Sequence, residues 1–345
     1  MFDARVWLAW TLTTLVVASS ARNPLYAAVL LMVTVVVGAV CGHDLDGRVP
    51  LSPFRFAVVA ISLSALFNGL TVHIGSTPLF HLPEWIPLVG GAVTLEALVF
   101  GAINGLTLTV IFSDFAVLNQ VTPVRDLIKL TPRAFHEAGV VLSIALTFIP
   151  QTTRSLKRIR EAQAVRGHRV RGLRDWLPIV VPLLISGLER SMGLAEAMVA
   201  RGYGAVSDRE QPLRTQALLV LGLLALLGGW LAWLFLPARK GIGVAGMVAG
   251  AGLIVGVVWL AGRGVSHTTY RRRRWTVRDT LVLLGCGLTL AVVMVPIPGM
   301  DRSTVYYSPY PGLTAPPFDP FIGLGLLGLL APAIFSTRRN TDDSI

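Results

Sequence analysis

Eight long apolar runs constrain this chain more than any other feature of its sequence. They cover residues 6–20, 25–41, 56–75, 92–118, 215–236, 242–262, 278–298 and 319–335. A helix needs about 20 apolar residues to cross the hydrocarbon core of a bilayer, and most of these runs are that long. Only 14% of the residues are charged, against about 25% in a typical soluble domain. The sequence therefore predicts an all-α membrane protein with about eight transmembrane helices.

The basic residues between these runs predict how the helices are oriented. Cytoplasmic loops carry an excess of Lys and Arg, and the two largest basic clusters lie at residues 154–174 and Arg271–Arg274. If both clusters are cytoplasmic, the loop 76–90, which has no Lys or Arg, and the Tyr-rich loop 299–318 lie outside. Counting the spans then places the N- and C-termini in the cytoplasm.

The first apolar run could instead be a cleaved signal peptide, because it ends in the small residues 18–21. A signal peptide begins with a positively charged region. Here the single Arg5 is offset by Asp3. We therefore expect residues 1–21 to be retained, with cleavage as the open alternative.

The middle segment 120–212 differs from the sequence on both sides. It contains two moderately apolar pieces, 134–150 and 176–194, and each has basic residues at both ends. A transmembrane helix with such flanks would leave one basic group outside. Both pieces are therefore expected to be helices that lie at or below the cytoplasmic face of the membrane.

One sequence frame occurs twice in this middle segment. Residues 161–167 and 196–202 both read E-A-x-x-x-R-G, and each copy ends a long helical pattern. A helix C-terminus explains one such copy, because Arg complements the negative end of the helix dipole and Gly adopts a left-handed conformation. Two copies on the basic side of the membrane favour a functional role.

The second copy resembles a known motif. Ala200-Arg201-Gly202 is similar to the Ala-Arg-Gly motif of the transmembrane T component of energy-coupling-factor (ECF) transporters, a family that includes the membrane subunit of a cobalt importer. The first copy departs from that motif at Val165, where the family has Ala. The candidate site residues are Ala164, Arg166, Gly167, Ala200, Arg201 and Gly202.

Three further stretches resemble the same family. Residues 2–5 (FDAR) are similar to its opening element, residues 143–150 (SIALTFIP) precede its first motif, and residues 275–280 (WTVRDT) resemble the start of its last membrane helix. The chain is therefore expected to divide into four parts. They are N-terminal transmembrane helices (1–119), a cytoplasmic coupling-helix segment (120–212), an inserted transmembrane hairpin (213–262), and C-terminal helices with a tail (263–345).

The resemblance implies a division of labour between several proteins in a prokaryotic plasma membrane. Two long crossed coupling helices would dock into two ABC-type ATPase subunits, and the membrane helices would hold a substrate-binding S subunit. The complex would import a vitamin or a transition metal. The chain itself would be a non-catalytic subunit without a cofactor, and the S subunit would select the substrate.

Two other classes of function remain as alternatives. A conventional ABC importer permease also carries an E-A-x-x-x-x-G coupling loop, although normally one per subunit and without the Arg. An intramembrane enzyme would need clustered polar groups, but the spans offer single, scattered residues. These are Asn68, His73, Glu96, Asn104 and Asp114. A secondary transporter would need a similar cluster.

Several functions are excluded by what the sequence lacks. It contains no G-x-x-x-x-G-K-[ST] phosphate loop, so ATP hydrolysis would belong to another polypeptide. The six His residues show no metal-ligand spacing. Nucleic acid is not an expected partner, because the basic residues follow the loops of a membrane protein and are not interleaved with aromatic residues.

The orientation can be tested with accessible tags. We expect tags at Ser207 and at the C-terminal Ile345 to be protected in sealed right-side-out vesicles, and a tag at Ser308 to be cleaved by external protease. External cleavage at Ser207 would contradict the cytoplasmic assignment of the middle segment.

Overall fold

The computed structural model describes residues 2–42, 52–83, 90–131, 136–168, 172–203, 213–235, 240–262, 275–295, 297 and 299–336. Several residues named above lie outside these ranges: 169–171, Arg271–Arg274, Ser207 and Ile345. Within the described residues the regular secondary structure is helical apart from one two-stranded ribbon. The prediction of an all-α membrane protein is confirmed.

Seven helices in the described part of the chain are long and apolar enough to cross a membrane. They are α2 (Pro24–Cys41), α3 (Pro53–Thr71), α4 (Leu95–Val121), α7 (Leu177–Ala200), α8 (Leu213–Phe235), α9 (Lys240–Gly262) and α10 (Val277–Met294). Helix α7 qualifies by length and hydropathy, although its sequence context favoured a position at the cytoplasmic face. That position stays a prediction.

The chain forms two compact units, residues 1–127 with 271–345 and residues 128–270. Helix α1 (Ala4–Ser20) lies in the core of the first unit, where it packs against α4 and α10. The Trp10 side chain is fully buried, and its indole N–H donates a hydrogen bond of 2.9 Å to the carbonyl of Leu329. Helix α1 is therefore anchored by a residue near the C-terminal end of the chain.

The C-terminal segment completes this core. It contains α11 (Pro320–Leu326), the 3₁₀ turn η5 (Leu327–Leu330) and α12 (Ala331–Phe335). The Thr289 hydroxyl of α10 donates to the carbonyl of Gly325 (2.9 Å), and the Asn23 amide donates to the carbonyls of Thr304 and Pro317 (2.7 Å each). Residues that follow 275–280, the last stretch that resembles the family, thus supply part of the buried interior.

Two loops of the first unit meet at one end of α1. The ribbon of β1 (Pro78–Leu82) and β2 (Gly91–Thr94) follows α3, and the 3₁₀ turn η4 (Arg302–Val305) follows α10. The rings of Phe100 and Tyr310 lie 5.5 Å apart, which joins the two regions. Tyr306 also forms a backbone bridge to Arg22, directly after α1. This arrangement agrees with the expectation that the loops after α3 and after α10 lie on the same side of the membrane.

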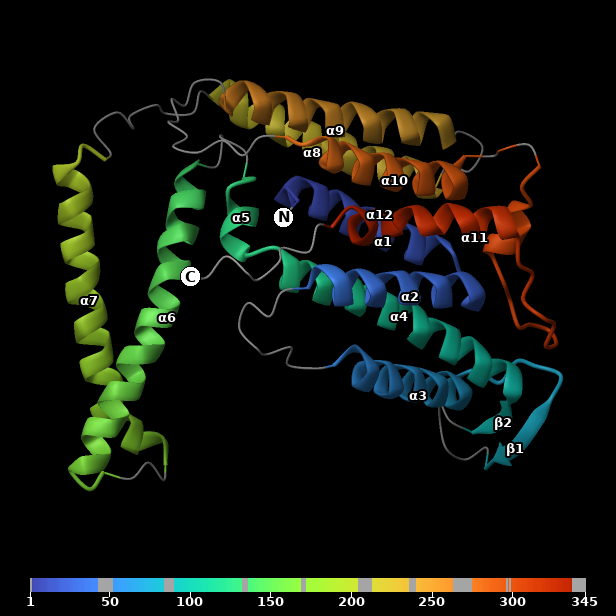
Figure 1. Cartoon of the computed structure of the whole chain (residues 1–345), viewed down its shortest axis with the longest axis horizontal. Helices are drawn as coiled ribbons and strands as arrows, with labels where there is room; N and C mark the ends of the chain where they lie inside the picture. Colours follow the sequence, from blue (N-terminus) through green and yellow to red (C-terminus); the bar gives the residue numbers. More distant parts are fainter. Residues whose placement is uncertain are drawn as a thin grey trace, which may run out of the picture. The chain divides into compact units, whose positions relative to one another are not determined.

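The opposite end of α1 contacts the start of α10. The Asp3 N–H, just before α1, lies 3.2 Å from a carboxylate oxygen of Asp279 in the first turn of α10. The two helices therefore begin at the same end of the unit. Figure 1 shows this core with α1, α2 and α4 in blue to teal and the C-terminal helices in red.

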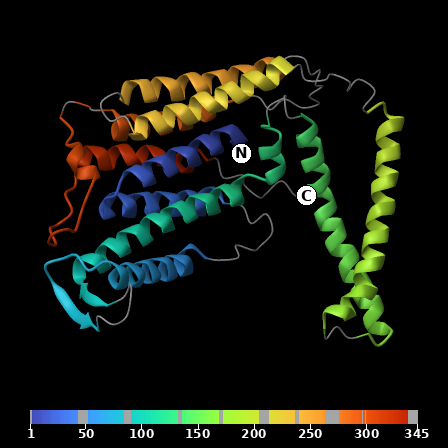
Figure 2. The same cartoon turned by 180° about the vertical axis from the view of Figure 1, so that it is seen from behind.

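The second unit contains two helix pairs. The first is α6 (His136–Val165) with α7, preceded by the short α5 (Val124–Ile128) and linked by the 3₁₀ turn η2 (Leu173–Trp176). The helices α6 and α7 run antiparallel, because Gln163 contacts Pro178 and Ser155 contacts Arg190. Figures 1 and 2 show that they cross near the C-terminal end of α6 and diverge toward its start.

The second pair, α8 and α9, is a hairpin built on glycine. A Cβ added at Gly229 would lie 2.5 Å from the backbone nitrogen of Met247, and one at Gly250 would lie 2.6 Å from that of Leu226. Neither position accommodates a methyl group, so the two backbones touch directly, as in membrane helices that pack through small residues. Leucine and tryptophan side chains cover the outer faces of the hairpin.

The hairpin can be removed as a test of its independence. Joining Gln211 to Trp275 deletes two spans and so preserves the orientation of α10. Because α8 and α9 pack mainly on each other, we expect the shortened protein to insert and the first unit to keep its thermal stability. Loss of insertion, or a tag at Ser308 that becomes inaccessible, would mean that the hairpin belongs to the core.

Candidate functional site

The first E-A-x-x-x-R-G frame forms the C-terminal end of α6. The N–H of Gly167 donates to the carbonyl of Ala164, and the N–H of His168 donates to that of Gln163, both at 3.0 Å. Gly167 has a φ of +81°. This pair of hydrogen bonds with a left-handed glycine is the Schellman motif, which satisfies carbonyls that the end of a helix would leave unpaired.

The second frame ends α7 in the same way. The N–H of Gly202 donates to the carbonyl of Val199 (2.9 Å), and the N–H of Tyr203 donates to that of Met198 (3.0 Å). Gly202 has a φ of +79°. A Cβ on Gly167 or Gly202 would meet nothing within 4 Å, so the backbone conformation, and not a lack of space, requires glycine at both positions.

Both motif arginines project from these helix ends. Arg166 and Arg201 are exposed, and neither guanidinium makes a hydrogen bond or ion pair with any residue in the described part of the chain. An exposed valine accompanies each arginine: Val165 is 90% exposed and Val199 is 72% exposed. Each helix end, which we call a tip, thus presents a cation beside an apolar side chain.

The two tips lie at opposite ends of the helix pair. Because the helices are antiparallel, Gln163 near the first tip lies against Pro178 at the start of α7, while the second tip lies at the far end of α7. Helix α7 has 24 residues, and at 1.5 Å per residue the tips are about 36 Å apart. The structure therefore does not bring the candidate residues into one site but presents two separate ones.

No sequence pattern indicated a polar contact at the helix crossing. Ser155 is only 7% exposed, and its hydroxyl accepts hydrogen bonds from Arg158 of α6 (3.4 Å) and Arg190 of α7 (3.3 Å). Arg158 belongs to the basic cluster, but Arg190 lies 35 positions from Ser155. The only sequence signal for Arg190 is that it belongs, with Glu189, to the first charged pair after the long uncharged run 177–188.

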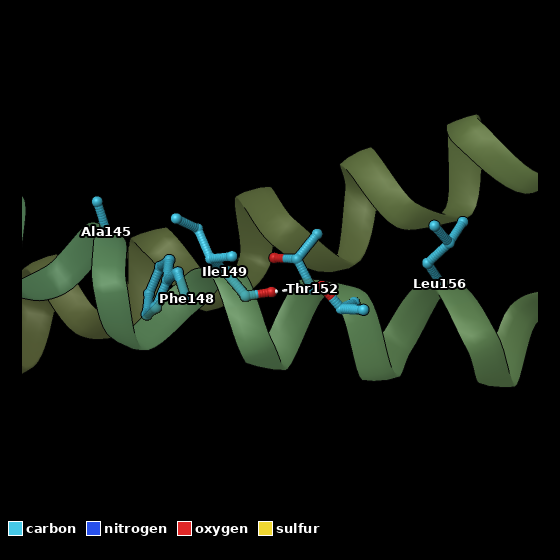
Figure 3. Close-up of a pocket in the computed structure, with 6 residues that line it drawn as sticks. Ala145, Phe148, Ile149, Thr152 and Leu156 are labelled. Carbon is cyan, nitrogen blue, oxygen red and sulfur yellow. Dashed lines mark hydrogen bonds between the residues drawn. The ribbon is translucent and has the colours of Figure 1, made fainter. Parts of the chain in front are cut away.

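A shallow groove follows one face of α6. Figure 3 shows Ala145, Phe148, Ile149, Thr152 and Leu156 along this face, with the α7 ribbon behind. The same face continues into Lys157, Arg160 and Glu161 toward the first tip. Along this face the helix is therefore apolar in its first half and charged in its second half.

The polar residues of the membrane helices do not form a catalytic cluster among the residues described. The Glu96 carboxylate, in the first turn of α4, is fully buried and accepts hydrogen bonds from the Ser76 N–H and hydroxyl and from the Thr77 N–H (3.1, 2.9 and 3.1 Å). The Asn68 amide donates to the carbonyl of Ala97 (2.9 Å). These contacts hold a loop and two helices together. Within the described ranges, no group of His, Cys, Asp and Glu is placed to bind a metal ion.

The fold and the two tips together define a class: an all-α membrane protein with a crossed pair of helices that presents arginine at two helix ends. Comparison with known proteins identifies the family. The sequence model of the cobalt transport protein family (CbiQ) matches residues 2–213, and the chain belongs to this family, as a T component of an ECF transporter.

Relatives with this role are similar over much of the chain. The energy-coupling factor transporter transmembrane protein EcfT of Bacillus selenitireducens is 30% identical over 227 residues, which are 60% of this chain and 80% of the relative. EcfT of Lactococcus lactis subsp. cremoris is 30% identical over 203 residues, 50% of this chain and 76% of the relative. EcfT of Exiguobacterium sibiricum is 36% identical over 109 residues, which span less than half of its length (41%).

The family match ends at Leu213, the first residue of the hairpin α8–α9. The expected resumption of the resemblance at residues 275–280 lies outside the matched range and stays a prediction. The contact between Asp3 and Asp279 nevertheless places α10 in the same compact unit as the matched N-terminal helices.

The glycines of the tips provide a direct test of their geometry. Gly167→Ala and Gly202→Ala place a Cβ in a left-handed residue, which costs about 1–2 kcal/mol. We expect amide hydrogen exchange in the last turn of α6 or α7 to accelerate about 5- to 30-fold. Gly172→Ala is the matched control, because Gly172 has an extended φ of −144° and its Cβ would also meet nothing within 4 Å. Equal effects of all three substitutions would contradict the left-handed tips.

Proposed function

We propose that this chain couples two cytoplasmic ABC-type ATPase subunits to a membrane-embedded S subunit, for uptake of a vitamin or a transition metal. In this function the chain hydrolyses no ATP and transmits motion between the other subunits. One observation carries the proposal. A single helix pair presents two helix ends of the same geometry, each with one exposed arginine, and these two ends are about 36 Å apart. Two equivalent tips fit two equivalent docking partners.

The chemistry of the tips supports docking into an acidic groove. A guanidinium is always charged, and its planar fork of donors can grip a carboxylate in two places. The Schellman hydrogen bonds use only backbone groups, so each arginine side chain remains available to a partner. The exposed valines beside them add apolar area that a close-fitting groove would bury.

The crossed helices suggest how the tips could act together. Each ATPase would hold one end of the pair, and ATP-driven approach or separation of the two ATPases would move the tips. Packed helices tend to move as rigid bodies or to slide past one another in small steps. The pair would then carry the movement to the membrane-embedded S subunit.

The proposed orientation places both termini and the tips in the cytoplasm. Its support is the charge distribution of the loops, together with the common end at which α1 and α10 begin. The scattered contacts of Glu96 and Asn68 give no specific support to an intramembrane enzyme, and the repeated tip is not expected of a conventional ABC permease.

Substitution of the motif arginines tests this function. Loss of one partner of a buried charge pair costs on the order of 3–5 kcal/mol, whereas an exposed pair contributes only ~0–1 kcal/mol. Arg166→Ala and Arg201→Ala should therefore strongly reduce co-purification with the ATPases and ATP-driven uptake. Arg→Lys should restore only part of the loss, because Lys cannot make the two-point contact.

Arg214→Ala is the matched control, since Arg214 is an exposed arginine at the start of α8. It should assemble and transport like the unmodified protein. If the arginines only cap their helices, each Ala substitution would cost at most ~1 kcal/mol and leave assembly intact. Normal assembly and uptake by both Arg→Ala variants would rule out the proposed docking.

A further inference from the structure

Two cationic side chains converge at the crossing of α6 and α7. The Arg158 and Arg190 Nη2 atoms lie 3.4 and 3.3 Å from the same Ser155 Oγ, so they are at most 6.7 Å apart, the sum of the two distances. Ser155 is buried at 7% exposure. Two positive charges are thus held close together around one neutral hydroxyl, a group that we call the crossing cluster.

In the described part of the chain, no carboxylate forms an ion pair with either guanidinium. Glu189 directly precedes Arg190 in the sequence but does not pair with it, and Glu161 pairs with Lys157 at 4.0 Å. Neither arginine side chain makes a further hydrogen bond to the residues described. Each guanidinium has five N–H donors, of which one is used here. The Ser155 hydroxyl also keeps its own hydrogen to donate. The cluster therefore offers many donors and a net positive charge to an anion.

The surroundings of the crossing cluster point to the kind of anion. Residues 138–153 of α6 carry no charge and extend from the cluster in one direction, and residues 177–188 of α7 carry none and extend in the other. Both stretches expose large apolar side chains, among them Ile149 (61%), Leu184 (66%) and Leu188 (65%). Apolar helices of this kind lie against hydrocarbon, and basic side chains set among them reach the level of the lipid phosphates.

We propose that Ser155, Arg158 and Arg190 bind the phosphate group of an anionic phospholipid at the cytoplasmic face of the membrane. The planar guanidinium donors match the geometry of phosphate oxygens, and basic pockets between helices on this side of a membrane bind lipid head groups. The bound phosphate offsets one of the two positive charges, which reduces the repulsion between the arginines and so stabilises the crossing. This lipid site does not depend on the docking of the ATPases, because it involves neither tip.

Lipid binding to the purified full-length chain tests the site. The chain is placed in phosphatidylcholine nanodiscs with increasing phosphatidylglycerol, and bound lipid and the melting temperature are measured. We expect phosphatidylglycerol to saturate a site and to raise the melting temperature. At about 1 kcal/mol for each basic residue, the variant Arg158→Gln/Arg190→Gln should bind about 30-fold more weakly. Arg160→Gln, on the groove face of α6, should bind like the unmodified chain.

A second variant distinguishes the site from general attraction of basic residues to anionic lipid. In Arg158→Glu, the new carboxylate lies beside Arg190 and takes the place of the lipid phosphate. It should preserve the melting temperature in pure phosphatidylcholine and abolish the response to phosphatidylglycerol. An unchanged response of Arg158→Glu, or an equal loss of binding in Arg160→Gln, would overturn the proposal.

A last measurement distinguishes binding of a lipid phosphate from binding of free inorganic phosphate. Inorganic phosphate at millimolar concentration should neither displace phosphatidylglycerol nor raise the melting temperature in phosphatidylcholine. If inorganic phosphate reproduces the full shift, the cluster binds a soluble anion and the assignment to lipid is wrong.

Discussion

Hydrogen bonding of the backbone inside a bilayer is the constraint on which the rest of this structure depends. Hydrocarbon offers no partner for N–H and C=O groups, so each membrane segment pairs its own as a helix. Only helix ends retain unpaired groups, and most of the special chemistry of the chain lies there. Glu96 holds a loop at the start of α4, and Arg166 and Arg201 project from the ends of α6 and α7. Asp114 is an exception: it is buried within α4, and its carboxylate has no hydrogen-bond partner among the residues described.

The helix-end explanation and the docking explanation of the repeated frame are compatible. The glycine and the backbone of each tip complete the Schellman hydrogen bonds without the arginine side chain. Capping therefore leaves the guanidinium free, while it fixes the direction in which the last turn points. A rigid helix end is a better docking element than a loop, because less conformational freedom is lost when a partner binds.

The crossed helices connect the proposed functions physically. The position of one tip relative to the other depends on the angle at which α6 and α7 cross, and the crossing is formed by contacts such as that of Ser155 with Arg190. A phosphate bound there would stabilise this angle. The lipid bilayer would in this way act on the same geometry that the proposed ATPase partners would act on from the two tips.

The sequence by itself determined the all-α fold, most of the long apolar helices and the chemistry of the tips. Hydropathy and glycine preferences act between neighbours in the chain, so the long apolar runs and the ends at Gly167 and Gly202 could be predicted. The sequence alone did not determine that Trp10 donates a hydrogen bond to Leu329, that residues 299–336 complete the core, or that Arg190 contacts Ser155. Only the tertiary structure decided these contacts. An apolar helix face has the same composition whether it meets lipid or another helix, so shape and hydrogen-bond direction select the partner.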